Sequence, residues 1–285
     1  WELWNEMNAM QLPKDRAFFA WNEKMLVELK KRFPKNLAMQ SLGSFDNPRV
    51  RETYREMMDM PGNEVAQVHR YLDLGAPMEI CHGPVDILTA DAVRELLGYR
   101  NKKPVILAET GAVEPRHTGP SQYYRLDTAG VILHDALFAP FFSGAAGAGM
   151  IWHWDQYVAE NNLWHHFNRF AQVVDQLNPV KEQLAPFYYE NDDLRIYLLK
   201  GKETFLMWCR DKQSPWESEL KNGIEARTLK RSVLPEQALN IPALKSQALQ
   251  TFDPWKNEWR SLEPVNGQIV LPDFRRSIIV KGQLQ

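Results

Sequence analysis

The first 185 residues alternate between short apolar runs and longer segments in which apolar side chains recur every three to four residues. Short apolar runs are typical of strands, and the longer spacing is typical of amphipathic helices. Strand-like runs occupy residues 1–6, 36–42, 65–71, 105–108 and 149–154, and helices are predicted at 15–33, 47–58, 90–99, 123–138 and 163–177. Because strands joined through helices pair in parallel, the alternation predicts a parallel sheet covered by helices.

The pattern changes after Pro186 to short runs of alternating polar and apolar residues. Turn sequences such as Val265-Asn266-Gly267 separate these runs. The predicted strands cover residues 194–199, 204–210, 226–233, 246–252, 258–263, 268–271 and 277–280. We therefore expect an all-β antiparallel sandwich at 186–285 after an α/β domain at 1–185.

Composition excludes several classes of protein. The 285 residues are 44% hydrophobic and 25% charged, as in ordinary globular proteins. The formal net charge of −2, without a long run of Lys or Arg, gives no electrostatic basis for binding nucleic acid or an anionic membrane. No stretch approaches the ~18 apolar residues that span a bilayer. We expect Cys81 and Cys209, far apart in the sequence, to be buried free thiols.

Two acidic residues close strand-like runs: Glu6 follows residues 1–5, and Glu109 follows residues 104–108. In a parallel α/β barrel, catalytic groups lie where strands end and loops begin, so both acids are placed at the mouth of such a barrel. A carboxylate there costs several kcal/mol to desolvate unless it is paired or used. The two glutamates are therefore the first candidates for catalytic residues.

Four motifs occur in a fixed order along the chain: Asn5-Glu6, Val68-His69-Arg70-Tyr71, Ile106-Leu107-Ala108-Glu109-Thr110-Gly111 and Met150-Ile151-Trp152-His153-Trp154. In this order they resemble strands four, six, seven and eight of the retaining β-glycosidases of glycoside hydrolase clan A, which include the family 5 cellulases and mannanases. A lone Asn-Glu or Glu-x-Gly would mean little, whereas four ordered motifs are far more specific. The resemblance covers about residues 1–185.

The resemblance implies roles for three residues. Glu109 matches the nucleophile of the seventh strand, and Glu6 matches the acid/base of the fourth. Asn5 matches the residue that contacts the sugar 2-hydroxyl. Retaining hydrolysis requires two carboxyl groups about 5–5.5 Å apart, one of them protonated and the other ionised.

The resemblance also implies substrate contacts on the sixth and eighth strands. Tyr71 matches the tyrosine whose hydroxyl hydrogen-bonds the nucleophile. Within a strand His69 and Tyr71 face the same side, and His69 is expected to bind a substrate hydroxyl, with a backbone contact as the alternative. Trp152 is expected to floor the sugar subsite, and Trp154 to pack within the barrel.

The resemblance implies a (β/α)8 TIM barrel, but the chain opens at the motif of strand four. A closed barrel has eight strands and typically ~250 residues. An open set of five strands leaves unpaired edges, so we expect strands one to three to come from a preceding segment or a second chain. The family's Arg and His on its early strands have no counterpart here, and we expect activity to require the absent strands. We expect an extracellular, periplasmic or cell-surface location.

Patterns for other catalytic chemistry are missing. His153-x-Asp155 and the adjacent His165 and His166 come nearest to a metal site, but neighbouring helical histidines point about 100° apart and no His pair at i, i+4 accompanies a Glu. We therefore expect no metal and no other cofactor. The glycine-rich run at 144–149 precedes a strand, whereas a dinucleotide-binding loop follows one.

The sequence thus predicts a retaining hydrolase of β-linked poly- or oligosaccharides. The alternative from another class is a catalytically inactive carbohydrate-binding protein, indicated if the two carboxylates lie much more than about 6 Å apart or if an Arg or Lys pairs with Glu6. Transfer to another sugar would use the same residues. The sandwich is interpreted as a structural buttress; a sugar-binding module would instead expose Trp208, Trp216, Trp255 and Trp259 in a row.

Overall fold

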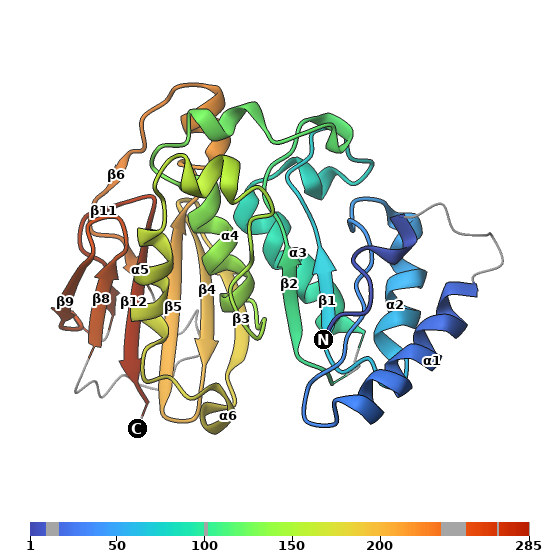
Figure 1. Ribbon diagram of the computed structural model, residues 1–285. Helices are drawn as coiled ribbons and strands as arrows, with labels where there is room; N and C mark the ends of the chain where they lie inside the picture. Colours follow the sequence, from blue (N-terminus) through green and yellow to red (C-terminus); the bar gives the residue numbers. More distant parts are fainter. Residues whose placement is uncertain (10–16, 100–101, 235–248, 267, 285) are drawn as a thin grey trace.

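The computed structural model describes residues 1–9, 17–99, 102–234, 249–266 and 268–284. Figure 1 shows two parallel strands near the centre, with α1 and α2 on one side and α3, α4 and α5 toward the other. A larger antiparallel sheet overlaps α4 and α5 in this view and extends away from β1 and β2. The molecule is therefore mixed α/β, with a parallel part followed along the chain by an antiparallel part.

The parallel part is built around β1 (Ala66–His69) and β2 (Val105–Glu109), which are paired in parallel. Single parallel bridges add Glu2 to Met39 and Thr110 to Ile151. A hydrogen bond from the Glu64 amide to the Ala38 carbonyl, 2.8 Å long, holds the segment around residue 39 near β1. Parallel pairing thus joins the first two predicted segments to each other and the last three to one another, although only two segments are regular strands.

The predicted strands at 36–42 and 149–154 are therefore wrong in extent, because each pairs through a single bridge. Among the described residues, no bridge joins the segment at 1–3 to the segment at 149–152, so the parallel array is open. Residues 152–154 form a turn that leads directly into a π-helical segment.

The helices agree broadly with the periodicity of the sequence. The α-helices are α1 (Ala17–Arg32), α2 (Arg51–Asp59), α3 (Val85–Gly98), α4 (Val131–Phe142), α5 (His165–Val174) and α6 (Pro179–Glu182). Short 3-10 or π segments are η1 (Met7–Ala9), η2 (Pro48–Val50), η3 (Glu79–His82), η4 (Pro115–His117), η5 (Gln122–Arg125), η6 (Asp155–Ala159) and η7 (Glu217–Lys221). No described helix is long and apolar enough to cross a membrane.

The predicted helix at 123–138 is instead divided into η5 and α4. Gly130 has a φ of +76°, which breaks the helix because this left-handed conformation favours glycine. The Asp127 carboxylate accepts hydrogen bonds of 2.8 and 2.9 Å from the amides of Val131 and Ile132, so it caps the new helix. All 12 residues of α4 are buried, as expected for a helix that is apolar all round.

The antiparallel part contains a six-stranded sheet in the order β3-β4-β5-β12-β8-β9. Its strands are β3 (Ala185–Glu190), β4 (Leu194–Lys200), β5 (Thr204–Asp211), β8 (Leu249–Asp253), β9 (Glu258–Leu262) and β12 (Ser277–Gln283). Two small pairs join β6 (Thr228–Leu229) to β11 (Phe274–Arg275) and β7 (Val233–Leu234) to β10 (Ile269–Val270).

The sequence prediction missed β3 and β11 and merged β6 with β7 into one strand at 226–233. Residues 246–248 of the predicted strand at 246–252 lie outside the described residues. The short pairs contribute Leu229, Leu234 and Phe274 to a cluster on one face of the large sheet. This second layer is much smaller than the full sandwich that the sequence pattern predicts.

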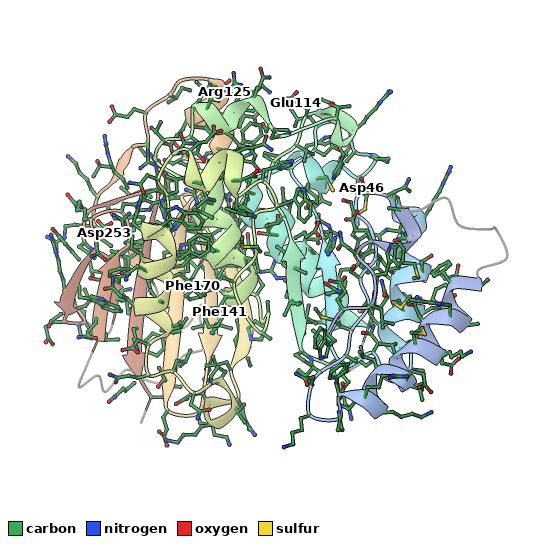
Figure 2. All side chains as sticks on the ribbon, in the orientation of Figure 1. Asp46, Glu114, Arg125, Phe141, Phe170 and Asp253 are labelled. Carbon is green, nitrogen blue, oxygen red and sulfur yellow. The ribbon has the colours of Figure 1, made fainter. Side chains whose placement is uncertain are left out.

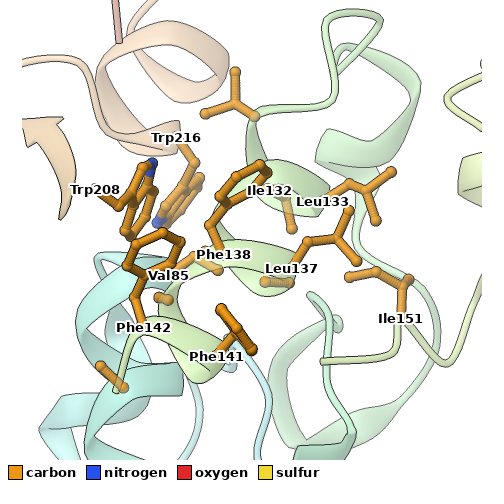
Figure 3. Packing of buried hydrophobic residues seen from close by; sticks show 14 of the residues in the cluster. Val85, Ile132, Leu133, Leu137, Phe138, Phe141, Phe142, Ile151, Trp208 and Trp216 are labelled. Carbon is orange, nitrogen blue, oxygen red and sulfur yellow. The ribbon is translucent and has the colours of Figure 1, made fainter. Parts of the chain in front are cut away.

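A single apolar core joins the helices to the antiparallel sheet. Figure 3 shows Phe138 and Phe142 of α4 beside Trp208 of β5, and the centres of their rings lie 5.9 and 6.3 Å from the tryptophan ring. Trp208 and Trp216 are buried, and Trp255 and Trp259 are partly buried. Because these tryptophans form no exposed row, the packing favours a structural role for the antiparallel part over a sugar-binding module.

Buried ion pairs reinforce this contact. The carboxylate of Asp86 on α3 accepts two hydrogen bonds from Arg195 of β4, 2.5 and 2.9 Å long. The Tyr197 hydroxyl donates a third, of 2.9 Å, to the same carboxylate. The carboxylate of Asp135 on α4 accepts two hydrogen bonds from Arg210 of β5, 2.8 and 3.1 Å long. Cys81 and Cys209 are buried free thiols, as the sequence analysis predicted.

The substitution Asp86→Asn tests how strongly the two parts are joined. Arg195 would keep its charge in a buried site without a counter-charge, so we expect the free energy of unfolding to fall by about 3–5 kcal/mol. Urea unfolding measures this loss. The control Glu28→Gln removes one partner of the exposed Glu28–Lys31 pair and should leave the midpoint unchanged. Equal midpoints for the two variants would contradict the expectation.

Candidate active site

The ends of the parallel segments bring Glu6, His69 and Glu109 together. Nδ1 of His69 lies 2.8 Å from Oε1 of Glu6 and 3.3 Å from Oε2 of Glu109. One carboxylate oxygen of each glutamate and one ring nitrogen of His69 all lie within 4.8 Å of one another. The histidine therefore bridges the two acids that the sequence analysis singled out.

An irregularity in strand pairing places His69 opposite Glu109. Val68 of β1 pairs with Leu107 of β2, but the next residue, His69, pairs with Glu109, so Ala108 is skipped. Such a bulge adds one unpaired residue and re-aims the side chains that follow it. Both side chains then point toward Glu6, which an unbroken register would not allow.

Glu6 lies in a turn after the segment at 1–3, and its backbone is strained. Its φ is +48°, in the left-handed region that non-glycine residues rarely adopt. The Ser41 hydroxyl accepts a hydrogen bond of 2.8 Å from the Glu6 amide, and the Ala9 amide donates one of 2.8 Å to the Glu6 carbonyl. These bonds hold a conformation that aims the carboxylate at His69.

Glu109 receives two hydrogen bonds that the sequence analysis did not fully foresee. The Tyr71 hydroxyl donates to Oε2 at 2.7 Å, as the resemblance implied. The Asn5 side chain also hydrogen-bonds this carboxylate. Asn5, expected to contact a sugar hydroxyl, is thus also a partner of Glu109.

The environment of Glu109 alters its acidity. Burial raises the pKa of its carboxyl group, and His69 and the Tyr71 hydroxyl act in the opposite direction. The negative charge of Glu6 raises the pKa of Glu109 further. The result is a pKa above the ordinary value, so the hydrogen bonds only partly offset the cost of burying the anion.

A pocket of about 180 Å³ opens in front of the two glutamates. Asn5, Tyr71 and Trp152 contribute to its wall. Trp152 is 53% exposed, so its ring face is free to stack on a ligand. His153 also lines the pocket, and its Nδ1 atom is buried without a hydrogen-bond partner among the described residues.

Two details of the predicted site are different in the structure. Trp154 is 47% exposed and lies beside Trp164, so the prediction that it packs inside the barrel is wrong. The strand that would have turned it inward ends at Ile151. His69 is only 1% exposed and contacts the two carboxylates instead of lining the pocket.

His117, which no sequence pattern singles out, also lines the pocket. Its ring packs edge-on against Tyr71, with the ring centres 4.9 Å apart. Nδ1 of His117 lies 3.0 Å from Oδ2 of Asp73, and Nε2 lies 3.0 Å from the Ser44 hydroxyl. His117 is in a loop eight residues after Glu109, and no strand-end signal marks it.

Backbone strain coincides with this contact. Arg116 and His117 have φ values of +65° and +57°, and the Asp73 carboxylate accepts a hydrogen bond of 3.1 Å from the Arg116 amide. Two consecutive left-handed residues without glycine are costly, and such strain concentrates at functional sites. Asp73 therefore fixes both the loop and the ring that contacts Tyr71.

Two groups of described residues bring three potential metal ligands together. They are Glu6, His69 and Glu109, and Asp46, Asp73 and His117. In each group the histidine already lies within hydrogen-bond distance of a carboxylate. Neither group contains His153, Asp155, His165 or His166, the residues from which the sequence analysis considered a metal site.

Comparison with solved structures shows what the fold is similar to. A family 30 glycoside hydrolase, an endoxylanase from Clostridium papyrosolvens C71, matches with a TM-score of 0.52 and 9% identity, covering 100% of this chain and 65% of its own. An α-amylase from Anoxybacillus matches with a TM-score of 0.51 and 9% identity, covering 94% of this chain and 56% of its own. No protein-family model matches the sequence, and no curated protein matches it.

The chain thus has a glycoside-hydrolase-like fold and spans 65% and 56% of the lengths of these two enzymes. A likeness at 9% identity is a likeness of fold alone. Fold does not determine chemistry, and a xylanase and an amylase act on different glycans.

Replacing Tyr71 by Phe tests the electrostatics of Glu109. The hydroxyl stabilises the carboxylate, so its loss should raise the pKa of Glu109 further. Carbon-13 NMR of labelled glutamate carboxyl groups follows this titration without any substrate. The control Tyr99→Phe removes a hydroxyl that bonds another glutamate, Glu95, at 3.3 Å, and it should leave Glu109 unchanged. An unaltered titration of Glu109 in Tyr71→Phe would contradict the assigned hydrogen bond.

Proposed function

We propose that this protein is a retaining β-glycoside hydrolase that cleaves β-linked poly- or oligosaccharides by double displacement. The observation that carries the proposal is the separation of Glu6 and Glu109, whose nearest ligand oxygens lie within 4.8 Å at the wall of one pocket. Retaining enzymes have carboxyl groups about 5–5.5 Å apart, and inverting enzymes about 6.5–9.5 Å. The fold, like that of known glycoside hydrolases, supports the same proposal.

In the first step, the Glu109 carboxylate attacks the anomeric carbon, and the bond to the leaving oxygen breaks. Glu6 donates its proton to that oxygen, so the leaving sugar departs as a neutral alcohol. In the second step, the Glu6 carboxylate removes a proton from water, and the water oxygen attacks the same carbon. Glu109 is released as an anion, Glu6 regains its proton, and the anomeric configuration is retained.

Two neighbours stabilise the ionised form of Glu109, which partly offsets the burial that raises its pKa. Tyr71 and Asn5 donate hydrogen bonds to Glu109 and stabilise the anion needed for attack. Nδ1 of His69 lies 2.8 Å from Oε1 of Glu6, so the histidine holds the Glu6 carboxyl group in place. Trp152 supplies an exposed aromatic face for a pyranose ring.

An inactive carbohydrate-binding protein is less consistent with this geometry. Such a protein would separate the two acids or neutralise Glu6 with a permanent cation. Among the residues that the structure describes, the ion pair of Glu6 is with His69, whose charge depends on its protonation. A polymeric substrate also supports action outside the cytoplasm, since polysaccharides do not cross membranes freely.

Substitutions of the two acids test the mechanism on a panel of aryl β-glycosides and soluble β-linked polysaccharides. Glu109→Gln should abolish turnover of every substrate. Glu6→Gln should lower kcat on the order of 10²–10⁴-fold for substrates with a poor leaving group. It should spare the first step for dinitrophenyl glycosides, whose leaving group needs no proton. Glu79, an exposed residue of η3, provides the control Glu79→Gln, which should retain full activity.

Two outcomes would contradict the proposal. Equal losses of kcat in Glu6→Gln for substrates with good and poor leaving groups would contradict the acid/base role of Glu6. Binding of β-linked oligosaccharides without turnover of any substrate, by protein that includes the expected strands one to three, would establish a binding protein instead. Proton NMR of the first product distinguishes retention from inversion, and inversion would exclude the covalent role of Glu109.

Asp73→Asn tests the loop that holds His117. The weaker bond should loosen the ring beside Tyr71 and shift Glu109, so we expect kcat to fall about 10- to 10²-fold with little change in KM. The pH dependence of kcat should also move, because Tyr71 lowers the pKa of Glu109. The control Asp175→Asn alters an exposed residue after α5. A change in thermal stability alone, with normal kinetics, would limit Asp73 to a structural role.

A further inference from the structure

Two histidines that the proposed mechanism does not use are buried where α4, α5 and the antiparallel sheet meet. His134 on α4 and His166 on α5 are both 0% exposed. Figure 2 shows Phe141 of α4 close to Phe170 of α5, and the centres of these two rings lie 5.3 Å apart. The two histidines therefore lie in an interface whose other side chains are mainly apolar and aromatic.

The rings of both histidines are closely packed. The ring centre of His134 lies 4.3 Å from that of Phe138, 4.5 Å from that of Trp255 and 5.8 Å from that of His166. The ring of His166 lies against Gly130, just before α4: a Cβ atom at this glycine would lie 2.6 Å from Nε2 of His166. Such packing keeps bulk water away from a charge on either ring.

Each ring has a hydrogen-bond partner on one nitrogen only. Nε2 of His166 lies 2.9 Å from the Ala129 carbonyl, which can only accept, so Nε2 carries the proton of the neutral ring. Nε2 of His134 lies 2.8 Å from the Ser277 hydroxyl. Nδ1 of both rings is buried without a partner among the described residues. Because an imidazolium has two N–H donors, a second proton on either ring would leave a buried donor unpaired.

The charged groups that face the two rings do not offset a positive charge. The basic groups are His165 and Arg169 of α5, Arg210 of β5 and Arg276 before β12. The acids on the adjoining elements are already paired: Asp135 with Arg210, Glu219 with Arg276, and Asp253 with Lys256. Asp127, before α4, accepts hydrogen bonds from two amides and from the Tyr157 hydroxyl. A charged ring would therefore meet cations and occupied acids.

These surroundings keep both rings neutral in the folded protein. Burial lowers the pKa of His166 to about 3. Burial, with His166 and the nearby arginines acting in the same direction, holds the pKa of His134 well below its ordinary value. In the unfolded chain a histidine takes up a proton at about pH 6.5. The two rings therefore contribute stability that is fully present above about pH 6.5 and is lost as the pH falls below it.

We infer that His134 and His166 form an acid-sensitive lock between the helices and the antiparallel sheet. The interface is closed while both rings are neutral, and a proton on either ring opens it, because neither the charge nor the added N–H group finds a partner. The lock is connected to the candidate active site: Tyr157 of η6 hydrogen-bonds Asp127 at the start of α4, and η6 directly follows the pocket residues Trp152 and His153. Mild acid then dismantles the site, whatever reaction it catalyses.

Urea unfolding at a series of pH values, followed by tryptophan fluorescence without any substrate, tests the lock. Between pH 7.5 and 5.5, each neutral buried histidine should lower the ratio of folded to unfolded protein about 10-fold, and the pair about 100-fold. Glutamine keeps a neutral hydrogen-bonding side chain. His134→Gln and His166→Gln should therefore each remove about 10-fold of this loss, and the double variant about 100-fold. The control His82→Gln replaces a histidine that contacts the Ala76 carbonyl outside this interface, and it should remove none of the loss.

The comparison uses the change with pH, so it holds even if the variants are less stable than the unsubstituted protein at pH 7.5. Proton NMR of the assigned histidine rings in the unsubstituted protein gives a second readout that needs no variant. The signals of His134 and His166 should stay at the positions of neutral rings until the protein unfolds. Titration of either ring near pH 6.5 in the folded protein would overturn the lock. The same pH dependence in the double variant and the unsubstituted protein would also overturn it.

Discussion

Two carboxyl groups with oxygens within 4.8 Å of each other in a partly buried pocket cannot both ionise freely, so a proton or a bridging hydrogen-bond partner must hold them together. The ring of His69 bridges the two acids, since one nitrogen lies within hydrogen-bond distance of Glu6 and close to Glu109. Its position depends on the skipped residue in the pairing of β1 with β2. The candidate active site therefore depends on a β-bulge in a short parallel sheet. The helices packed around the sheet hold this bulge in place.

Rigid support for this arrangement comes from the centre of the molecule. The fully buried α4 contacts the antiparallel sheet on one side and the loops of the site on the other, and Tyr157 of η6 hydrogen-bonds the Asp127 carboxylate that caps it. The ring of Tyr123 packs against Trp216, which belongs to the antiparallel part. Packed aromatic side chains thus lie behind the loops of the site, which explains how irregular loops can keep a defined shape.

The sequence sufficed to predict the alternation of elements and the positions of Glu6 and Glu109, because strand ends and acidic residues are both visible in one dimension. It could not predict the partners of these acids. His117 reaches the pocket only through a left-handed loop held by Asp73, 44 residues earlier in the chain. The exposure of Trp154 could not be predicted from the sequence either, because the strand predicted at 149–154 ends at Ile151. Tertiary contacts decide both features, and periodicity carries no information about them.

The buried pairs of Asp86 with Arg195 and of Asp135 with Arg210 have a consequence for how such a protein can evolve. Each pair has one member on a helix of the parallel part and one on a strand of the antiparallel part. Exchange of the segment after residue 185 for an unrelated domain would leave two buried acids without their arginine partners and would expose α4 to solvent. The two parts are therefore not interchangeable modules, and recombination at this join would be selected against unless both arginines came with the new sheet.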